Sequence, residues 1–491
     1  MLLFNSFIFM IVNGKKGDYE VVIGLEVHAQ IKTDKKLFSN THYTFAEAQN
    51  SAVSCYDAAM PGVLPVLNFE AIEQAVRTGV AIGGTINKYS VFDRKSYFYP
   101  DLPSGYQITQ MYYPIVSDGF IDIIGDNGDI KRINIERIHI EQDAGKLIHD
   151  KLAGKSCLDL NRAGVPLMEI VSKPELKSQN EAVSYLKKLH GILRAIATSD
   201  ADMEKGSFRC DVNISVMPIG SGVFGTRCEV KNVNSFKFVK EAIVYEANRQ
   251  VELIESGGKV FQETRLYDSA KGVTFSLRAK EDSVDYKYFP DPDLLPVIIT
   301  DDIIEKIKAT IPELPEGRKA RYIKDYGFID RDAQALIEDE TASLFFDKIV
   351  ATGCDARMAF SWIMVELLGR LKKIGLNLEN SVVSSEKLGE LISSISNGII
   401  SGKMAKDVLD EMIETGKTAL QIIEEKGLRQ MDNSDEIESV VKQIIFDNPD
   451  KVAEYKSGKD KLFAFFVGQV MKITGGKANP QKISDILRKY L

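Results

Sequence analysis

The sequence predicts an α+β protein in which a strand-rich region is followed by helices alone. Between residues 18 and 296, four short stretches alternate apolar and polar side chains, which is the period of a half-buried strand. Pro and Gly punctuate this region up to Pro296, and beyond it apolar residues recur at helical spacing. We therefore expect a sheet domain over residues 18–296, a helical domain over 297–400 and a helical tail domain over 401–491.

The strands are expected at residues 21–31, 133–143, 208–216 and 226–231. In each stretch one set of alternate positions is largely apolar, and the other carries acids, bases or histidine. Successive side chains of a strand point to opposite faces, so one sheet can bury all four apolar sets together. Its other face would then be strongly polar.

That polar face would collect carboxylates and an imidazole from Glu26, His28, Glu141, Asp211 and Glu229, and cations from Arg209, Arg227 and Lys231. Carboxylates with a histidine suit a hard cation such as Mg²⁺, and arginine and lysine suit phosphate. The pattern indicates a sheet surface that binds metal and nucleotide. Four amphipathic strands with solvated salt bridges are the alternative.

Helices are expected in both regions. Residues 181–197 place Ala182, Leu186, Leu189 and Leu193 on one face, and residues 238–254 have similar spacing. After Pro296 we expect helices at residues 343–350, 359–374, 385–395, 403–414, 419–425, 436–448 and 459–473.

The charge is uneven along the chain. The net charge is −8, but residues 451–491 carry nine Lys and Arg against three acids, or +6, so the rest carries −14. A basic end on an acidic chain is a local footprint for nucleic acid, or else the solvated surface of helices.

The cysteines and the first residues bear on location. The five Cys lie far apart with no CxxC pair, which argues against a zinc ribbon and a disulfide framework and fits a reducing compartment.

Residues 1–12 are apolar but lack the basic start and the cleavage site of a signal peptide, and they are too short to span a bilayer. We expect a cytoplasmic protein without a membrane segment. If Met10 is the start, residues 1–9 are dispensable.

Common nucleotide-binding motifs are absent from the sequence. Residues 149–156 end in Gly-Lys-Ser but have His149 where a P-loop needs its first Gly, and no GxGxxG follows a strand. Nucleotide binding would therefore use the sheet face, and phosphoryl transfer needs no covalent nucleophile. Residues 92–110 mix basic and aromatic side chains, which either hold a base or an RNA end or pack within a structured loop.

Eight segments carry a resemblance to a known family. They are IGLEVHAQ (23–30), PGVLPVLN (61–68), FDRKSYFYPDLPSGYQITQ (92–110), HIEQDAGK (139–146), DLNRAGVPLMEIVSKPE (159–175), GSFRCDVNIS (206–215), EVKNVNSF (229–236) and DYKYFPDPDLLP (285–296). In this order they closely resemble the B subunit of the tRNA-dependent amidotransferase, the GatB family, which converts Asp-tRNA(Asn) and Glu-tRNA(Gln) to the amides. The C-terminal part, with GGKANP at 475–480, resembles the family's helical YqeY-type region.

The resemblance implies an antiparallel-sheet cradle of glutamine synthetase-like type and a two-step reaction. ATP phosphorylates the side-chain carboxylate of Asp or Glu esterified to tRNA, and ammonia then displaces phosphate. His28, Glu141 and Glu229 are the expected primary Mg ligands, with Glu26 and Asp211 at a second or outer position. The nucleotide phosphates are expected on Arg209, Arg227, Lys231 and Asn232.

The resemblance also implies partners. This chain shows no glutaminase machinery, so ammonia is expected from the amidase (the family's A subunit), in a heterotrimer that also holds a small C subunit. The basic tail is expected to bind tRNA(Asn) or tRNA(Gln).

Two departures from the family pattern matter. Some members bind zinc through paired Cys before the segment at 61–68, where this chain has only Cys55, so we expect no zinc. Gln142 stands where many members have a second Glu, on the face away from Glu141, so the site should survive.

Two other functions stay open from the sequence. In one, the chain is a non-catalytic tRNA-binding scaffold, against which tightly bound Mg–ATP would count. In the other, it is a stand-alone Mg-dependent ligase for a small carboxylate, which would turn over ATP without tRNA. Asp-tRNA(Asn), Glu-tRNA(Gln) or both are compatible with the motifs.

Overall fold

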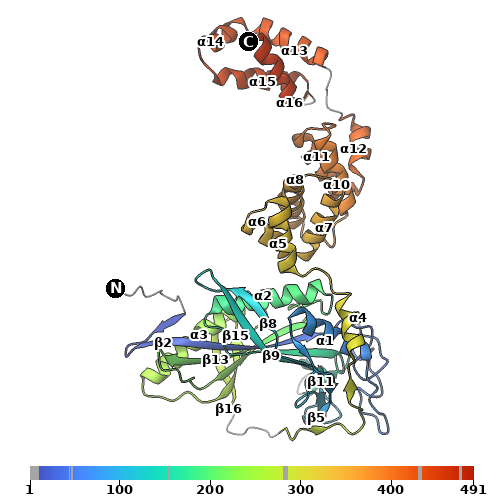
Figure 1. Ribbon diagram of the computed structural model, residues 1–491, viewed down its shortest axis with the longest axis vertical. Helices are drawn as coiled ribbons and strands as arrows, with labels where there is room; N and C mark the ends of the chain where they lie inside the picture. The colour runs from blue at the N-terminus through green and yellow to red at the C-terminus, as the bar shows by residue number, and fades with distance from the viewer. Residues whose placement is uncertain are drawn as a thin grey trace. The chain divides into compact units, whose positions relative to one another are not determined.

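The chain forms two compact units, Met1–Pro315 and Glu316–Leu491 (Figure 1). The computed structural model describes residues 10–491 except 44, 46–47, 153–154, 280–285, 429–433 and 475–477. The expectation about residues 1–9 lies outside the described residues. Within the described part, no helix is long and apolar enough to cross a membrane.

The first unit is built on a sheet of eleven strands. These are β1 (Ile11–Asn13), β2 (Asp18–Gln30), β3 (Thr85–Ile86), β7 (Val116–Ser117), β8 (Phe120–Ile124), β9 (Ile130–Gln142), β12 (Pro166–Ser172), β13 (Phe208–Pro218), β14 (Cys228–Lys231), β15 (Glu263–Asp268) and β16 (Val273–Ala279). The main order is β16-β15-β14-β13-β2-β12-β9-β7-β3, with β1 beside β2 and β8 beside β9. β14 and β15 pair in parallel, and the other neighbours are antiparallel.

Smaller sheets flank the large one. They are formed by β10 (Lys146–Leu152) with β11 (Lys155–Asp159), by β17 (Phe289–Pro290), β5 (Asp93–Ser96) and β6 (Tyr106–Thr109), and by β18 (Val297–Ile298) with β4 (Tyr89–Ser90).

The α+β class is confirmed, and the four expected strands share one sheet as β2, β9, β13 and β14. A fifth strand, β12, lies between β2 and β9. Its sequence PLMEIVS is apolar apart from Glu169 and the final Ser172, so the alternation that marks a half-buried strand is missing. This strand supplies a residue that the sequence reasoning did not single out.

Helices α1 (Phe69–Ala81), α2 (Gln179–Ala195) and α3 (Phe236–Glu255) cover the apolar face of the sheet (Figure 1). The odd residues of β2, such as Leu25 and Val27, pack with Leu186 of α2 and Ile243 of α3 in one hydrophobic core. The expected helices at 181–197 and 238–254 are thus confirmed. Burial of this face leaves the other face of each strand for polar residues.

The first unit extends past the expected boundary near 296, to Pro315. The reason is packing: α4 (Asp301–Lys308) lies against α1, and its Ile307 belongs to the core of the sheet. The change to helical spacing after Pro296 therefore marks a change of secondary structure inside one unit.

A β-bulge in β9 explains a break in its sequence pattern. Ile133 and Ile135 are buried, as are Ile138 and Ile140, so the apolar parity changes between them. Pairing with β12 shifts at this point, because Val171 faces Arg137 whereas Ser172 faces Ile135. The extra residue, Glu136, turns the following odd positions to the polar face.

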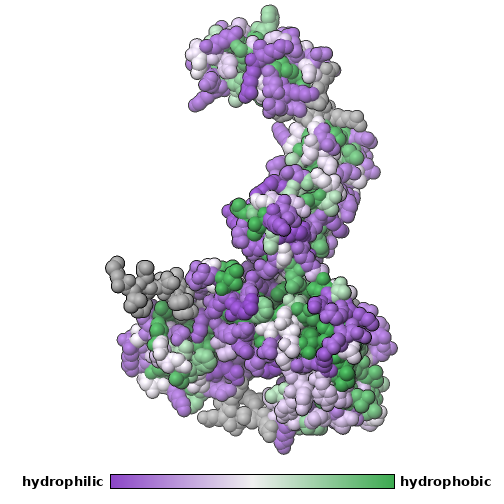
Figure 2. Space-filling model, viewed as in Figure 1, coloured by the Kyte–Doolittle hydropathy of each residue, from purple (hydrophilic) through white to green (hydrophobic). Residues whose placement is uncertain are grey.

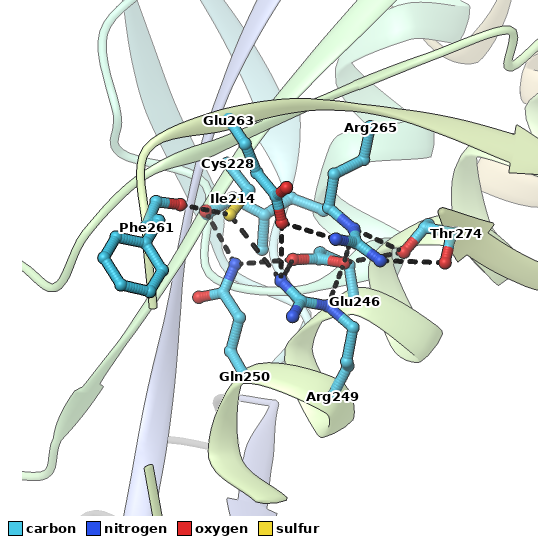
Figure 3. Close-up of polar contacts among 9 residues, drawn as sticks. All are labelled: Ile214, Cys228, Glu246, Arg249, Gln250, Phe261, Glu263, Arg265 and Thr274. Carbon is cyan, nitrogen blue, oxygen red and sulfur yellow. Dashed lines mark hydrogen bonds and ion pairs between the residues drawn. The ribbon is translucent and has the colours of Figure 1, made fainter. Parts of the chain in front are cut away.

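A buried ionic network fixes β15 and β16 to α3 on the apolar side (Figure 3). Glu246 of α3 is fully buried and accepts hydrogen bonds from Arg249 at 2.6 Å, Gln250 at 2.9 Å and Thr274 at 2.8 Å. Arg265 of β15 lies 3.2 Å from the same carboxylate. Burial disfavours the charged form, but these hydrogen bonds and the charge of Arg249 hold the pKa of Glu246 below its usual value.

The second unit is helical throughout its described residues. Its elements are α5 (Pro315–Tyr326), α6 (Asp330–Ile337), α7 (Glu340–Ala351), α8 (Ala356–Ser361), the π-helical turn η2 (Trp362–Leu367), α9 (Leu368–Lys373), α10 (Ser385–Ser396), α11 (Gly402–Thr415), α12 (Ala419–Lys426), α13 (Ser434–Asp447), α14 (Pro449–Lys456), α15 (Lys461–Ile473) and α16 (Pro480–Tyr490). The seven helices expected from spacing are confirmed, one of them as the continuous run α8–η2–α9.

Two separate hydrophobic clusters lie in this unit. One runs from Tyr322 to Ile423, and the other from Ile437 to Leu487. The break falls between Leu428 and Ile437, later than the expected boundary near 400, because α11 and α12 bury Val408, Leu409 and Ile422 in the first cluster.

Removing the Glu246 carboxylate should destabilise the first unit. Glu246→Ala removes one of the two carboxylates that the buried Arg265 and the partly buried Arg249 share and leaves Glu263 as their remaining acid, which costs roughly 3 kcal/mol. Glu252→Ala, at an exposed position of the same helix, should change the unfolding free energy by no more than ~0.5 kcal/mol. Urea unfolding followed by circular dichroism measures both; equal losses for the two variants would contradict the role of the network.

Candidate metal and nucleotide site

Five neighbouring strands place their polar side chains on one face of the sheet. Glu169 of β12 faces His28 of β2 on one side and His139 of β9 on the other. Across β2, Arg209 of β13 faces His28, and Asp211 faces Glu26. Residues directly opposite in a ladder share a face, so the register alone brings these groups together.

Three of these side chains are close enough to share one metal ion. His28, Glu141 and Glu169 each offer a ligand atom, and these atoms lie within 4.8 Å of one another. His28 Nε2 is 3.3 Å from Glu169 Oε2 and 3.9 Å from Glu141 Oε1. His139 Nε2 lies 3.2 Å from the same oxygen of Glu169 and 3.9 Å from Glu141 Oε2. We call His28, His139, Glu141 and Glu169 the central cluster.

The electrostatics of the central cluster suit a cation. Burial disfavours the charged form of His28, but its hydrogen bond to Glu169 and the nearby carboxylates outweigh this and raise the pKa of His28 to about 9. Burial also disfavours the charged form of Glu169, but His139 and His28 hold its pKa well below the usual value. Two carboxylates beside a histidine form an oxygen-rich donor set that fits Mg²⁺. The buried Nδ1 of His139 has no hydrogen-bond partner among the described residues.

The other carboxylates expected as metal ligands lie outside this group. Glu229 is 2.8 Å from Lys231 Nζ and accepts a 2.8 Å hydrogen bond from Thr264 of β15. Asp211 also pairs with Lys231, at a short distance. Lys231 thus lies between two acids, and although burial opposes it, their charges raise its pKa.

Glu26 lies on the same face but is held by a neutral partner. Asn213 of β13 donates a 2.8 Å hydrogen bond to its carboxylate. Burial, followed by the charge of Glu169, raises the pKa of Glu26. A carboxylate in this state binds a proton or a cation readily.

A pocket of about 250 Å³ opens at the Glu26 end of the polar face. It is lined by Val22, Gly24, Leu25, Glu26, Glu136, Val171, Ser172, Pro174, Asn213, Ser215, Phe224, Gly225 and Arg227. We call it the Gly24 pocket. The loop that carries exposed Phe224 packs closely against β13. A Cβ at Gly225 would collide there with the carbonyl oxygen of Val216, so this position requires glycine.

The expected phosphate-binding residues are spread across this face. Arg227 lines the Gly24 pocket. Arg209 instead forms an ion pair with Asp143 at 2.9 Å, on the other side of His28. Asn232 has a positive φ of 67° and donates its side-chain amide to the carbonyl oxygen of Tyr267 at 3.0 Å, which anchors the entry to α3.

A further cation lies near the central cluster. Lys95 of β5 is 4.9 Å above the ring of Tyr286. Burial opposes its charged form, but the charges of Glu141 and then Glu169 raise the pKa of Lys95. The sequence places Lys95 in the aromatic and basic segment and gives no sign of its place near Glu141 and Glu169.

Glu169 and His139 are the site residues that sequence reasoning missed. His139 does share its parity with Glu141, so the alternation contained the signal. Glu169 carried none, because its strand has no alternation. Gln142 pairs with Pro166 on the side opposite to Glu141 and contacts the carbonyl oxygen of Tyr106 at 3.4 Å, which agrees with its expected place away from the site.

Comparisons with known proteins match nearly the whole chain. The family described as the GatB/GatE catalytic domain matches residues 21–305, and the GatB domain matches residues 344–491. The B subunit of the aspartyl/glutamyl-tRNA(Asn/Gln) amidotransferase from Rickettsia canadensis (strain McKiel) is 50% identical over 480 residues, which is 98% of this chain and 99% of that protein. The protein of the same name from Wolbachia pipientis wMel is 52% identical over 476 residues, 97% of this chain and 99% of that protein. The chain therefore belongs to the GatB family, the B subunits of the tRNA-dependent amidotransferase.

Proposed function

We propose that this chain activates the side-chain carboxylate of Asp or Glu on misacylated tRNA by phosphorylation with ATP, and then directs ammonia onto it. The observation that carries the proposal is the central cluster, which places two carboxylates and two imidazoles at the middle of a sheet face lined by cations. Family membership supplies the reaction class. A purely structural salt-bridge surface would not need two carboxylates in the same small volume.

We assign the metal to His28, Glu141 and Glu169, since these offer donor atoms within 4.8 Å of one another. Bound Mg²⁺ would neutralise charge on the transferring phosphoryl group. His139, which lies 3.2 Å from Glu169, orients that carboxylate. Glu26 and Asp211, on the adjacent part of the face, are left for a second ion or for outer contacts.

The nucleotide is assigned to the Gly24 pocket. Exposed Phe224 offers an aromatic face for a base, and Arg227 offers a cation for phosphate. Gly24 and His28 are four residues apart on one strand, about 13 Å. A ligand bound in the pocket can therefore reach from there toward the central cluster, passing Lys231 of β14, which lies beyond β13.

We assign the production of ammonia to a partner protein that docks on this chain. The first unit exposes large apolar side chains that a partner can cover, including Leu64, Val66, Phe98 and Leu295, each more than half exposed. Figure 2 shows apolar areas on this unit. Exposed apolar surface of this kind is typical of protein interfaces. The partners proposed are the amidase, which is the A subunit, and the small C subunit, in a heterotrimer.

The tRNA is assigned in part to the last helical cluster, Ile437–Leu487. Residues 451–491 carry a net charge of +6, and Lys456, Lys461 and Lys472 are exposed there. Lysine contacts to phosphate are independent of base sequence and sensitive to salt. Lys477, in the same basic tail, lies outside the described residues.

Loss of one metal ligand should abolish amidation and metal binding together. Glu169→Gln keeps the shape of the side chain but removes the charge, so Mg²⁺ affinity and amidation of misacylated tRNA should each fall by at least about 100-fold. Isothermal titration with Mg²⁺ and an amidation assay of the reconstituted complex measure this, and glutaminase activity of the partner should stay measurable.

The matched control is Glu229→Gln, on the same face but outside the group. It should keep Mg²⁺ affinity within about threefold, because Glu229 pairs with Lys231 and Thr264. If Glu229→Gln lost as much affinity as Glu169→Gln, Glu229 would belong among the ligands after all.

Neighbouring residues on opposite faces should differ sharply. Glu141→Gln should abolish amidation, since Glu141 lies in the central cluster. Gln142→Glu should leave the amidation rate within about twofold, because its side chain lies on the other face of β9. Initial rates in the reconstituted complex test the pair, and a large effect of Gln142→Glu would place that position at the site.

Truncation should separate tRNA binding from the rest. A chain ending at Leu428 lacks the last hydrophobic cluster, Ile437–Leu487, and keeps the preceding one complete. It should therefore stay folded and sustain the glutaminase activity of the partner. Its affinity for tRNA should fall at least tenfold, because the basic tail is lost. A chain ending at residue 400 should be less stable, because it removes α11 and α12 from their core. Filter binding and thermal unfolding measure the two effects, and unchanged tRNA affinity in the chain ending at Leu428 would contradict the assignment.

A further inference from the structure

A second pocket, of about 200 Å³, lies at the C-terminal end of β2, whereas the Gly24 pocket lies along the middle of that strand. It is lined by Gln30, Ile31, Lys32, Thr33, Lys35, Tyr43, Phe45, Val165, Pro166, Asp200, Lys205 and Ser207. We call it the Lys32 pocket. Gln30 is two residues from His28 on the polar face, about 7 Å along the strand. The central cluster therefore lies between two pockets.

Polar contacts link the Lys32 pocket to the central cluster. Gln30 donates a 3.0 Å hydrogen bond to Asp143, and Arg209, which faces His28 across the ladder, lies 2.9 Å from the same carboxylate. Arg162 lies 3.6 Å from it as well. Asp143 is buried, but the charges of Arg209 and Arg162 keep its pKa below the usual value. The wall between pocket and cluster is thus polar and fixed in place.

The lining of the Lys32 pocket is basic. Lys32 and Lys35 are exposed, and neither makes an ion pair with any residue that the structure describes. Lys205 lies 3.3 Å from Asp202, outside the pocket lining. The acid in the lining, Asp200, accepts a hydrogen bond from Ser207. Two unpaired ammonium groups at the rim of a pocket attract a phosphate-bearing ligand.

Aromatic side chains complete the pocket. Tyr43 is partly buried, and Phe45 is 56% exposed. Aromatic rings beside lysines are the combination that proteins use to hold unstacked bases of single-stranded nucleic acid. A volume near 200 Å³ is below the range of roughly 300–1,000 Å³ that encloses a whole small ligand. It fits one end of a longer ligand whose remainder lies outside.

We propose that the Lys32 pocket holds the terminal nucleotide of the single-stranded acceptor end of the tRNA, with Lys32 and Lys35 on its phosphodiesters. This inference rests on the proposed function and names where its RNA substrate enters. The aminoacyl group then extends past Gln30 toward the central cluster, while the nucleotide approaches from the Gly24 pocket. The two substrates meet at the central cluster from opposite sides of His28 along β2.

The test uses the complete amidotransferase complex with the double variant Lys32→Ala/Lys35→Ala. The half-saturating concentration of misacylated tRNA should rise at least tenfold at moderate salt. The slope of log affinity against log salt should fall by about 0.7 for each lost phosphate contact. The half-saturating ATP concentration, the rate at saturating tRNA and glutaminase activity should be unchanged. Lys259→Ala/Lys271→Ala removes the same charge from exposed lysines elsewhere on the first unit and should change none of these quantities.

Tyr43 provides a second, independent readout. Tyr43→Phe keeps the ring and should keep the tRNA half-saturation point within about twofold, whereas Tyr43→Leu should raise it by roughly tenfold, the effect of one lost base stack. Thermal unfolding verifies that each variant is folded.

The outcomes separate this inference from the proposed function. An unchanged tRNA half-saturation point in a folded, active Lys32→Ala/Lys35→Ala complex would overturn the assignment of the pocket and leave the proposed function standing. A rise in the ATP half-saturation point instead would show that the pocket serves the nucleotide, and would overturn it too. Absence of amidation by the wild-type complex on any misacylated tRNA would contradict the proposed function itself.

Discussion

A slip of one residue in the pairing of β12 with β2 or β9 would turn Glu169 into the hydrophobic core and remove it from the central cluster. The site therefore depends on strand register, which is held by the apolar side chains on the opposite face. Leu25 and Val27 are buried against α2 and α3, so exposing them would cost roughly 1.5–3 kcal/mol each. Chemistry on one face of the sheet is positioned by hydrophobic burial on the other.

The bulge at Glu136 extends the same principle to β9. Before it, Ile133 and Ile135 lie in the core, and after it His139 and Glu141 lie on the polar face. One inserted residue thus lets a single long strand bury its first part against the helices and present its last part on the polar face. Without the bulge, Ile133 and Ile135 would lie on the same face of β9 as His139 and Glu141.

The edge of the sheet is held by polar contacts on both faces. Glu263 and Arg265 face α3 and join the network around Glu246, while Thr264 between them donates to Glu229 on the polar face. One strand, β15, therefore joins the buried network around Glu246 to the ion pair between Glu229 and Lys231. Such a network is costly to break, because the loss of one member leaves desolvated charge that the others compensate only in part.

The alternation of residues determined which faces of β2, β9, β13 and β14 are buried, because a strand has a strict period of two and burial favours the apolar set. It also placed Glu26, His28, Glu141, Asp211 and Glu229 on one face, and helical spacing located the helices of the second unit. Tertiary structure alone decided which of these acids meet. β12 inserts between β2 and β9 and brings Glu169 to His28, while β14 lies on the far side of β13 and leaves Glu229 with Lys231. Strand order depends on long-range pairing, and no local period of the sequence encodes it.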